Sequence, residues 1–206
     1  MPVDNIDGAI RKALETENTV FITDSGDNTT GGAAGDGTYV LERLLAHRVK
    51  DAVLGGIVDP EAVAAYEQAG IGAIVTLKIG GKMDNVFSRP YEITGEVLFL
   101  TPEAERDTYK RAAVVQVDGV QLVLLGVRRS FTAPEHFQQV AIDPLAHKIV
   151  VVKLGYLFQG LRDIAPNTIM ALTPGFCYQL VEELEYKHVQ RPVFPLDPEM
   201  SWTPGQ

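Results

Sequence analysis

Apolar and polar residues follow a regular rhythm along the first 80 residues of the chain. The run 20–23 is predicted to be the first strand, and 51–58, which is continuously apolar in its middle, is predicted to be a second strand covered on both faces of a sheet. A third strand is predicted at 73–79, and the alternation of strands and helices predicts parallel βαβ units with right-handed crossovers. Apolar residues recur at helical spacing in the segments 5–14 and 39–49. A further helix is predicted to start at Asp59-Pro60-Glu61, with an acidic cap and a proline at its first position, and to end at Gly70.

The rhythm changes after residue 82. Alternating polar and apolar residues predict a half-exposed strand at 91–100. The apolar runs 112–117 and 120–128 flank Asp118-Gly119, which is a strong signal for a hairpin turn. Residues 86–130 are therefore predicted to form an antiparallel insertion, folded as a smaller β layer.

Two further strands are predicted in the last third of the chain, at 149–153 and 168–172. The first of them is apolar throughout until it ends in a lysine, as expected for a buried strand. Before them, Thr132 and Glu135 form a capping-box pattern that predicts a short helix through residue 137.

The end of the chain combines an apolar segment with a proline-rich one. The spacing of Phe176, Leu180, Val181 and Leu184 predicts a final helix. From Arg191 onward four prolines predict an extended tail that wraps the surface.

These elements predict an α/β fold with a mixed, largely parallel sheet from βαβ units, flanked by helices and interrupted by an antiparallel β-hairpin insertion. The whole chain, 1–206, is predicted to be a single domain. Its α/β core would comprise 1–85 and 131–190, its β insertion 86–130 and its proline-rich tail 191–206.

The composition of the chain argues against nucleic-acid-binding and membrane proteins. With 46% hydrophobic and 22% charged residues, the chain has an ordinary globular composition. A net charge of −9 argues against a nucleic-acid surface, and no apolar run or leader-like segment indicates a membrane, so we expect a cytoplasmic protein. The single cysteine, Cys177, is predicted to be a small buried apolar residue in the final helix.

The densest candidate for function is the segment 24–38, D-S-G-D-N-T-T-G-G-A-A-G-D-G-T, called here the glycine loop. A strand that feeds such a loop and then a helix gathers backbone N–H groups that suit an anion. The loop matches neither of the two common phosphate-binding motifs, and its three aspartates would repel a phosphate unless a cation intervened. The same residues could instead make tight turns and cap the helix.

Ligands of open α/β sheets bind beyond the carboxyl ends of the strands, where the glycine loop and the loops after the next two predicted strands could converge. Lysines there would supply positive charge. We expect Asp59 to cap a helix rather than to bind a ligand. The candidate binding residues are Asp24, Ser25, Asp27, Asn28, Gly31, Gly32, Asp36, Thr38, Gly80, Gly81, Lys82 and Lys153.

No catalytic set or metal site can be assembled from the residues alone. The four histidines do not have the spacing of common zinc motifs, and His47 and His188 are predicted to lie at helix ends. Arg128 and Arg129 are predicted to be a solvated or ion-paired edge.

The glycine loop resembles the D-x-x-D-N-P-G-G-G-x-x-G-D-x-T signature that opens the C-terminal domain of the MlrC-like (microcystinase C) metallopeptidase family. The agreement continues in order along nearly the whole chain. It comprises V-D-P-E-A-V (58–63), A-G-I-G-A (69–73), I-G-G-K (79–82), A-I-D-P (141–144), V-V-V-K (150–153), T-P-G (173–175) and R-P-V-F-P-L-D (191–197).

This resemblance implies a C-terminal domain or subunit of a zinc metallopeptidase or amide hydrolase that acts on a small molecule or peptide. It implies that the zinc is held by an N-terminal domain, in cis or in trans, so no cofactor is expected on this chain. Two departures stand out: Thr29-Thr30 replaces proline-glycine, and G-Y-L-F-Q (155–159) stands where many relatives carry His-Phe-Arg.

Two alternatives remain open at this point. The chain could be a stand-alone module that holds a phosphate or carboxylate with the loop amides, Lys82 and Lys153. It could also self-associate through an apolar face that another domain would otherwise cover.

Overall fold

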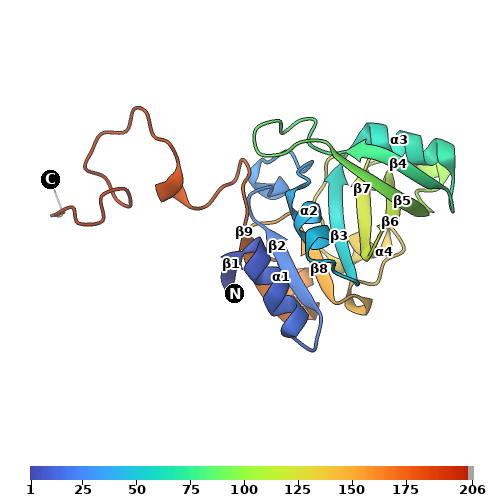
Figure 1. Cartoon of the computed structure of the whole chain (residues 1–206), viewed down its shortest axis with the longest axis horizontal. Helices are drawn as coiled ribbons and strands as arrows, with labels where there is room; N and C mark the ends of the chain where they lie inside the picture. Colours follow the sequence, from blue (N-terminus) through green and yellow to red (C-terminus); the bar gives the residue numbers. More distant parts are fainter. Residues whose placement is uncertain (204–206) are drawn as a thin grey trace.

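The body of the protein is built on one nine-stranded sheet in the computed structural model, which describes residues 1–203 (Figure 1). The strand order is β1-β9-β2-β8-β3-β7-β6-β5-β4. From β1 to β7 all neighbours are parallel, and from β7 to β4 all are antiparallel, which confirms the predicted fold class. The strands are β1 (Val3–Asn5), β2 (Val20–Asp24), β3 (Ala52–Val58), β4 (Ile74–Ile79), β5 (Tyr91–Leu100), β6 (Ala112–Val117), β7 (Val120–Leu125), β8 (Ile149–Val152) and β9 (Asn167–Leu172).

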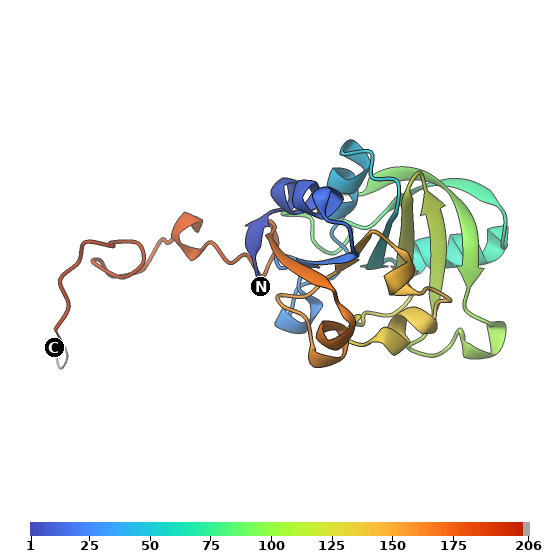
Figure 2. The ribbon, with the colours of Figure 1, turned by 90° about the horizontal axis from the view of Figure 1, so that it is seen from below.

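Helices cover both faces of the sheet (Figure 2). The first three bury Ile10, Leu44 and Tyr66 in one core. The last two bury Phe137 and Leu161 in a second core on the opposite face. The helices are α1 (Ile6–Glu15), α2 (Tyr39–Ala46), α3 (Pro60–Ala69), α4 (Pro134–Gln138) and α5 (Gln159–Ile164), with 3₁₀ turns η1 (Thr29–Gly31), η2 (Glu103–Glu105), η3 (Pro144–Ala146) and η4 (Val181–Glu183).

The centre of the parallel half consists of β2 and its two neighbours. Every residue of β2 is buried, including Thr23 and Asp24 at its end. The strand pairs with β9 on one side and with β8 on the other. Because Thr23 lies opposite Val152, β2 and β8 end at the same edge of the sheet, which brings Asp24 and Lys153 together there.

The antiparallel half differs from two predictions. β4 does not continue the parallel βαβ series but lies at the sheet edge and pairs antiparallel with β5. Its residues alternate in exposure, and Ile74 is 72% exposed, which suits an edge strand rather than a covered centre. Residues 86–130 are not a separate β layer either, because β7 joins the main sheet beside β3.

The end of the chain also differs from prediction. The segment 176–184 forms no α-helix and contains only the short turn η4. Phe176 packs on Phe87 of the body, but Val181 and Leu184 are exposed, and a helix this short is not stable without packing along its whole apolar face. The proline-rich tail stands away from the body instead of wrapping it (Figures 1 and 2), and residues 204–206 of the predicted tail lie outside the described residues.

Three local predictions are corrected as well. Helix α4 begins after Ala133 without a side-chain cap, because the Thr132 N–H donates to the His136 ring and the capping box does not form. His188 lies on the exposed tail and not at a helix end, whereas His47 does end α2, where it contacts Asp7 at 2.9 Å. Among the described helices, none is long and apolar enough to cross a membrane.

Candidate functional site

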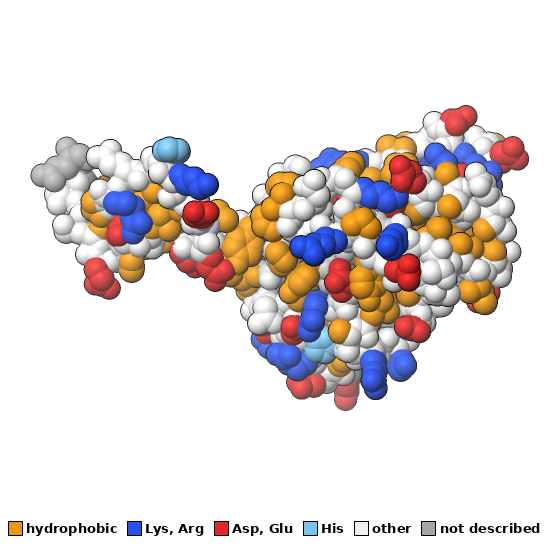
Figure 3. Space-filling view, turned by 45° about the horizontal axis from the view of Figure 1, so that its top comes forward, with side chains coloured by type: hydrophobic (Ala, Val, Ile, Leu, Met, Phe, Trp, Pro, Cys, Tyr) orange, Lys and Arg blue, Asp and Glu red, His pale blue; other side chains and the backbone are white. Residues whose placement is uncertain are grey.

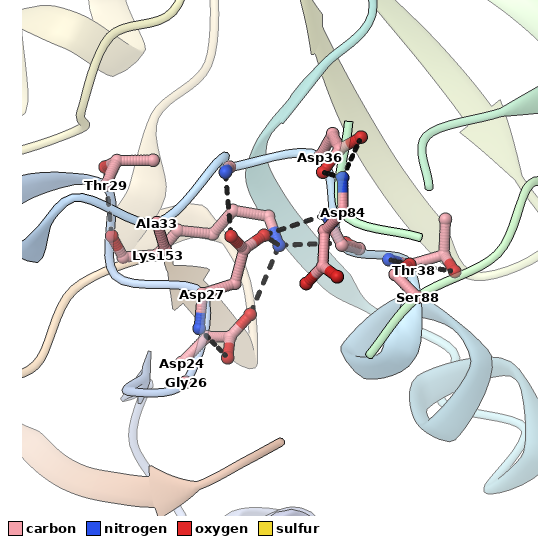
Figure 4. A network of polar contacts seen from close by, with 12 residues as sticks. Asp24, Gly26, Asp27, Thr29, Ala33, Asp36, Thr38, Asp84, Ser88 and Lys153 are labelled. Carbon is pink, nitrogen blue, oxygen red and sulfur yellow. Dashed lines mark hydrogen bonds and ion pairs between the residues drawn. The ribbon is translucent and has the colours of Figure 1, made fainter. Parts of the chain in front are cut away.

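The glycine loop follows β2 at the carboxyl edge of the parallel strands, and a network of polar contacts fixes it (Figure 4). Asp27 lies at the centre of this network. Its carboxylate accepts hydrogen bonds from the backbone N–H groups of Gly35 at 2.7 Å and Gly37 at 2.8 Å. The loop amides that could bind an external anion therefore bind a carboxylate of the chain itself.

Lys153 supplies the positive charge beneath the loop. Its side chain comes from the end of β8, is only 3% exposed, and places Nζ 2.7 Å from Asp27 and 3.2 Å from Asp24. The same nitrogen donates to the carbonyl of Gly37 at 2.8 Å. Burial disfavours the ammonium form, but the two aspartates outweigh it and raise the pKa of Lys153 above its ordinary value.

The third aspartate of the loop, Asp36, holds a different segment. Its side chain accepts from the N–H groups of Lys82 at 2.8 Å and Met83 at 2.6 Å, and its carbonyl accepts from Gly81 at 2.8 Å. Gly80 and Gly81 have φ values of +59° and +55°, and a Cβ on Gly80 would lie 2.4 Å from the Asp36 carbonyl oxygen. Only glycine allows this close approach.

Asp59 joins the loop after β4 to helix α3. It accepts from Ala62 at 3.0 Å, which confirms the predicted helix cap, and also from Gly80 at 2.9 Å. Lys82 reaches the surface but is ion-paired, because its Nζ lies 2.9 Å from Asp59 and 2.7 Å from Glu61. The loops expected to converge do meet here, but their charges pair with one another.

The candidate residues therefore fall into a buried set and an exposed set. In the exposed tip of the loop, Asn28 accepts from the N–H and hydroxyl groups of Thr30, and Gly32 adopts φ +102° with no neighbour within 4 Å of its missing Cβ. Lys82 is the other candidate that reaches the surface. The buried set consists of Asp24, Ser25, Asp27, Asp36, Thr38, Gly80, Gly81 and Lys153, while Asn28, Gly31 and Gly32 make up the tip.

Several residues of the network were not among the sequence candidates. Thr173 donates to Asp24 at 2.5 Å and accepts from the Gly26 N–H at 2.8 Å, so the T-P-G motif is a support of the glycine loop. Ser88 accepts from the Thr38 N–H at 3.0 Å. T-P-G was a visible signal for the first contact, but an isolated serine in a predicted loop gave none for the second.

The arginine pair also differs from prediction. Arg128 is exposed, as predicted, but its guanidinium also donates to the carbonyls of Thr29 at 2.6 Å and Ala33 at 2.6 Å and so holds the glycine loop. Arg129 lies 5.1 Å from the centre of the Phe131 ring, and burial lowers the pKa of its guanidinium. Neither arginine has a carboxylate partner within residues 1–203.

The segment 155–159 begins beside the exposed tip, at Gly155. The Thr23 hydroxyl donates to the Gly155 carbonyl at 3.1 Å, and a Cβ on Gly155 would lie 3.1 Å from the Asn28 amide nitrogen. Tyr156 and Phe158 are exposed. Cys177 is in a loop and half-buried, not in a helix, with Sγ 3.6 Å from the Asn28 carbonyl oxygen.

The described residues contain no evident metal centre. Within residues 1–203, no three His, Cys, Asp or Glu side chains are grouped so that they could hold a metal ion. The aspartates of the glycine loop instead bind backbone amides, a threonine and a lysine. The location of a zinc ion on another domain stays a prediction.

The fold and the motif residues around this loop define an α/β domain of a known family. The family described as MlrC C-terminus matches residues 22–188, and the chain belongs to that family. Microcystinase C from Sphingomonas sp is 25% identical over 186 residues, which are 87% of this chain and 36% of that protein. The chain thus spans about a third of the length of this curated relative.

A solved structure shares the fold. The crystal structure of a "Putative metallopeptidase" from Mesorhizobium sp. BNC1 matches with a TM-score of 0.79 at 23% identity. The match covers 98% of this chain and 42% of that one. At this identity the likeness concerns the fold alone, and it shows that the fold occurs within a chain more than twice as long.

Proposed function

We propose that this chain is the C-terminal domain or subunit of a cytoplasmic MlrC-like zinc metallopeptidase or amide hydrolase. In this proposal an N-terminal domain holds the zinc, and the exposed tip of the glycine loop borders the substrate. The observation that carries the proposal is the contrast within the loop, whose tip faces solvent while its base is fixed by buried contacts. The family and the length of its relatives support a partner domain.

The residues of this chain would bind and orient substrate. The glycines of the tip allow a substrate to approach the backbone closely, and the network beneath them keeps the tip in one conformation, so little ordering is needed when substrate binds. Zinc, when bound to the other domain, would supply the Lewis acid.

The contacts count against the alternative of a stand-alone anion-binding module. Lys153 and the amides of Gly35 and Gly37 are occupied by the chain's own aspartates. The amides of Lys82 and Met83 are occupied by Asp36. An external phosphate or carboxylate would have to displace these carboxylates from a buried network.

The proposal is tested by metal analysis and a peptide-hydrolysis assay, on this chain alone and together with the N-terminal MlrC-like region that accompanies it. We expect stoichiometric zinc and hydrolysis only when the N-terminal region is present. Tight zinc binding by this chain alone, or hydrolysis without the N-terminal region, would contradict the proposal.

A pair of glycine variants tests the tip. Gly32 and Gly72 both have positive φ and open space around them, and asparagine tolerates such a conformation better than most residues. Gly32→Asn should lower kcat/KM roughly tenfold by displacing the substrate, whereas Gly72→Asn, far along the chain on the α3–β4 turn, should leave it nearly unchanged. Equal changes of kcat/KM in the two variants would contradict the proposal that the tip of the glycine loop borders the substrate.

A further inference from the structure

The chain ends in an arm, residues 174–203, that leaves the body after β9 (Figures 1 and 2). Its root is fixed to the glycine loop. The Cys177 N–H donates to the Gly26 carbonyl at 2.9 Å, and Phe176 packs edge to face on Phe87 with ring centres 5.6 Å apart. Beyond this root the backbone hydrogen bonds of the arm are to other residues of the arm.

The arm exposes apolar side chains along its whole length (Figure 3). Large apolar side chains that are exposed together on one segment mark contact sites in soluble proteins. The largest exposed fractions are at its tip, where Phe194 is 72% and Trp202 71% exposed. The exposed apolar residues beyond the root are Val181, Leu184, Tyr186, Val189, Phe194 and Trp202.

The end of the arm is held by contacts within the arm itself, without support from the body. Arg191 forms an ion pair with Asp197, whose carboxylate also accepts from the Val193 N–H at 2.8 Å. The turn held in this way carries an apolar hollow of about 490 Å³ lined by Val193, Phe194, Pro198, Met200 and Trp202. An ordered, apolar surface at the end of an arm is suited to a protein partner and not to solvent.

The comparison with the solved structure indicates the partner. A match that covers 98% of this chain includes the arm, and the matched protein is more than twice as long. We infer that the arm lies across the N-terminal domain of its own MlrC-like protein, which buries the tip. This inference rests on the proposed function, because it requires that an N-terminal domain accompanies this chain.

The root of the arm gives this contact a second consequence. The arm follows Thr173, which binds Asp24, and its Cys177 binds Gly26, so its base is part of the support of the glycine loop. An arm that is held at its tip by the N-terminal domain therefore joins that domain to the loop proposed to border the substrate.

Trp202 makes the inference measurable, because it is the only tryptophan of the chain. The full chain labelled with 5-fluorotryptophan gives one ¹⁹F signal from the tip of the arm, and an unlabelled N-terminal region adds none. We expect the signal to shift and broaden when the two are mixed, and light scattering to show a one-to-one complex.

Each other outcome overturns the inference. A complex with an unchanged Trp202 signal would leave the proposed function standing but would remove the arm from the interface. The absence of any complex would remove the N-terminal partner itself, and the proposed function with it. A signal that changes with the concentration of this chain alone would show that a second copy covers the arm.

A matched pair of variants gives an independent measurement. Phe194 on the arm and Ile74 on the β4 edge are both 72% exposed, so replacing either should disturb the isolated body equally little. Phe194→Ser should weaken the complex at least about tenfold, as expected for an aromatic anchor, whereas Ile74→Ser should not. Equal affinities of the two variants would contradict the inference.

Discussion

The glycine loop and the C-terminal arm are two irregular segments that begin where a strand of the same sheet ends, yet they differ in almost every contact. The loop follows β2 and gives its amides and carboxylates partners inside the chain. The arm follows β9 and touches the body only at its root. An irregular backbone is thus fixed by buried polar partners and not by its amino-acid composition, since both segments are rich in residues typical of loops.

The largest loss of stability should follow the replacement of Lys153, which lies beneath the glycine loop. Lys153→Met leaves Asp24 and Asp27 buried without a counter-charge and should lower the free energy of unfolding by about 3–5 kcal/mol. Urea denaturation measures this loss. Lys12→Met, which breaks an exposed pair with Asp4, is the control and should cost less than about 1 kcal/mol. Similar losses would contradict the role given to Lys153.

Substitution of two glycines with positive φ should lower stability more in the buried network than in the exposed tip of the glycine loop. Gly80→Ala places a Cβ 2.4 Å from the Asp36 carbonyl oxygen and should destabilise the chain by about 3 kcal/mol, through backbone strain and overpacking together. Gly32→Ala meets no neighbour within 4 Å and should cost only about 1 kcal/mol of strain. Thermal unfolding of the two variants would refute this order if Gly32→Ala were the less stable.

Alkaline pH should weaken the buried region. Burial, and then the charge of Asp59, raise the pKa of Tyr66 to about 12, and the pKa of Lys153 is raised as well. A raised pKa means that the folded chain favours the protonated form. These contributions are therefore complete below pH values of about 10, where the unfolded groups are protonated, and are lost as the pH rises through the folded values.

Tyr66→Phe tests the tyrosine part of this pH dependence. The Tyr66 hydroxyl is buried without a hydrogen-bond partner among the described residues, so its removal should change stability at pH 7 by no more than about 1 kcal/mol. Between pH 10 and 12 the variant should lose less stability than the parent chain, by about 1–2 kcal/mol in urea denaturation. Parallel pH profiles of the two proteins would contradict the raised pKa of Tyr66.

The smallest effect should come from the arm. Arg191→Met removes the ion pair with Asp197 at the exposed tip and should leave the thermal midpoint of the isolated chain unchanged. Limited proteolysis should nevertheless cut the variant arm faster, because the turn at its tip is no longer held. A lowered midpoint would show that the arm supports the body, and the comparison between the two regions would then fail.

Much of the fold could be predicted from local sequence patterns. The strand-like run of β2 and the acid-proline start of α3 are local signals, and both elements form as predicted. The partner of β4 depends on contacts with a later strand, which periodicity does not contain. The helix predicted at 176–184 failed because helical spacing needs a surface to pack on, and the arm has none of its own.

The sequence identified which residues make up the site, but not whether their side chains face solvent or the interior. Asp24 and Asp27 meet Lys153, and Asp36 meets the loop after β4, as convergence at the carboxyl edge of the sheet predicts. Whether a carboxylate faces solvent or the interior is decided by partners distant in the sequence. Lys153 is 126 residues from Asp27, and Thr173 is 149 residues from Asp24, so no local motif reports those contacts.

The order of strands in the sheet has a consequence for synthesis on the ribosome. The strands β4 to β7 pair with their neighbours in the chain and can assemble soon after residue 125 has emerged. The strand β2 is made early, but its two neighbours β8 and β9 are among the last strands to be translated. The nascent chain must therefore keep β2, whose residues are all buried in the folded protein, without its two neighbours through most of translation, and an unpaired strand of this kind is prone to aggregation.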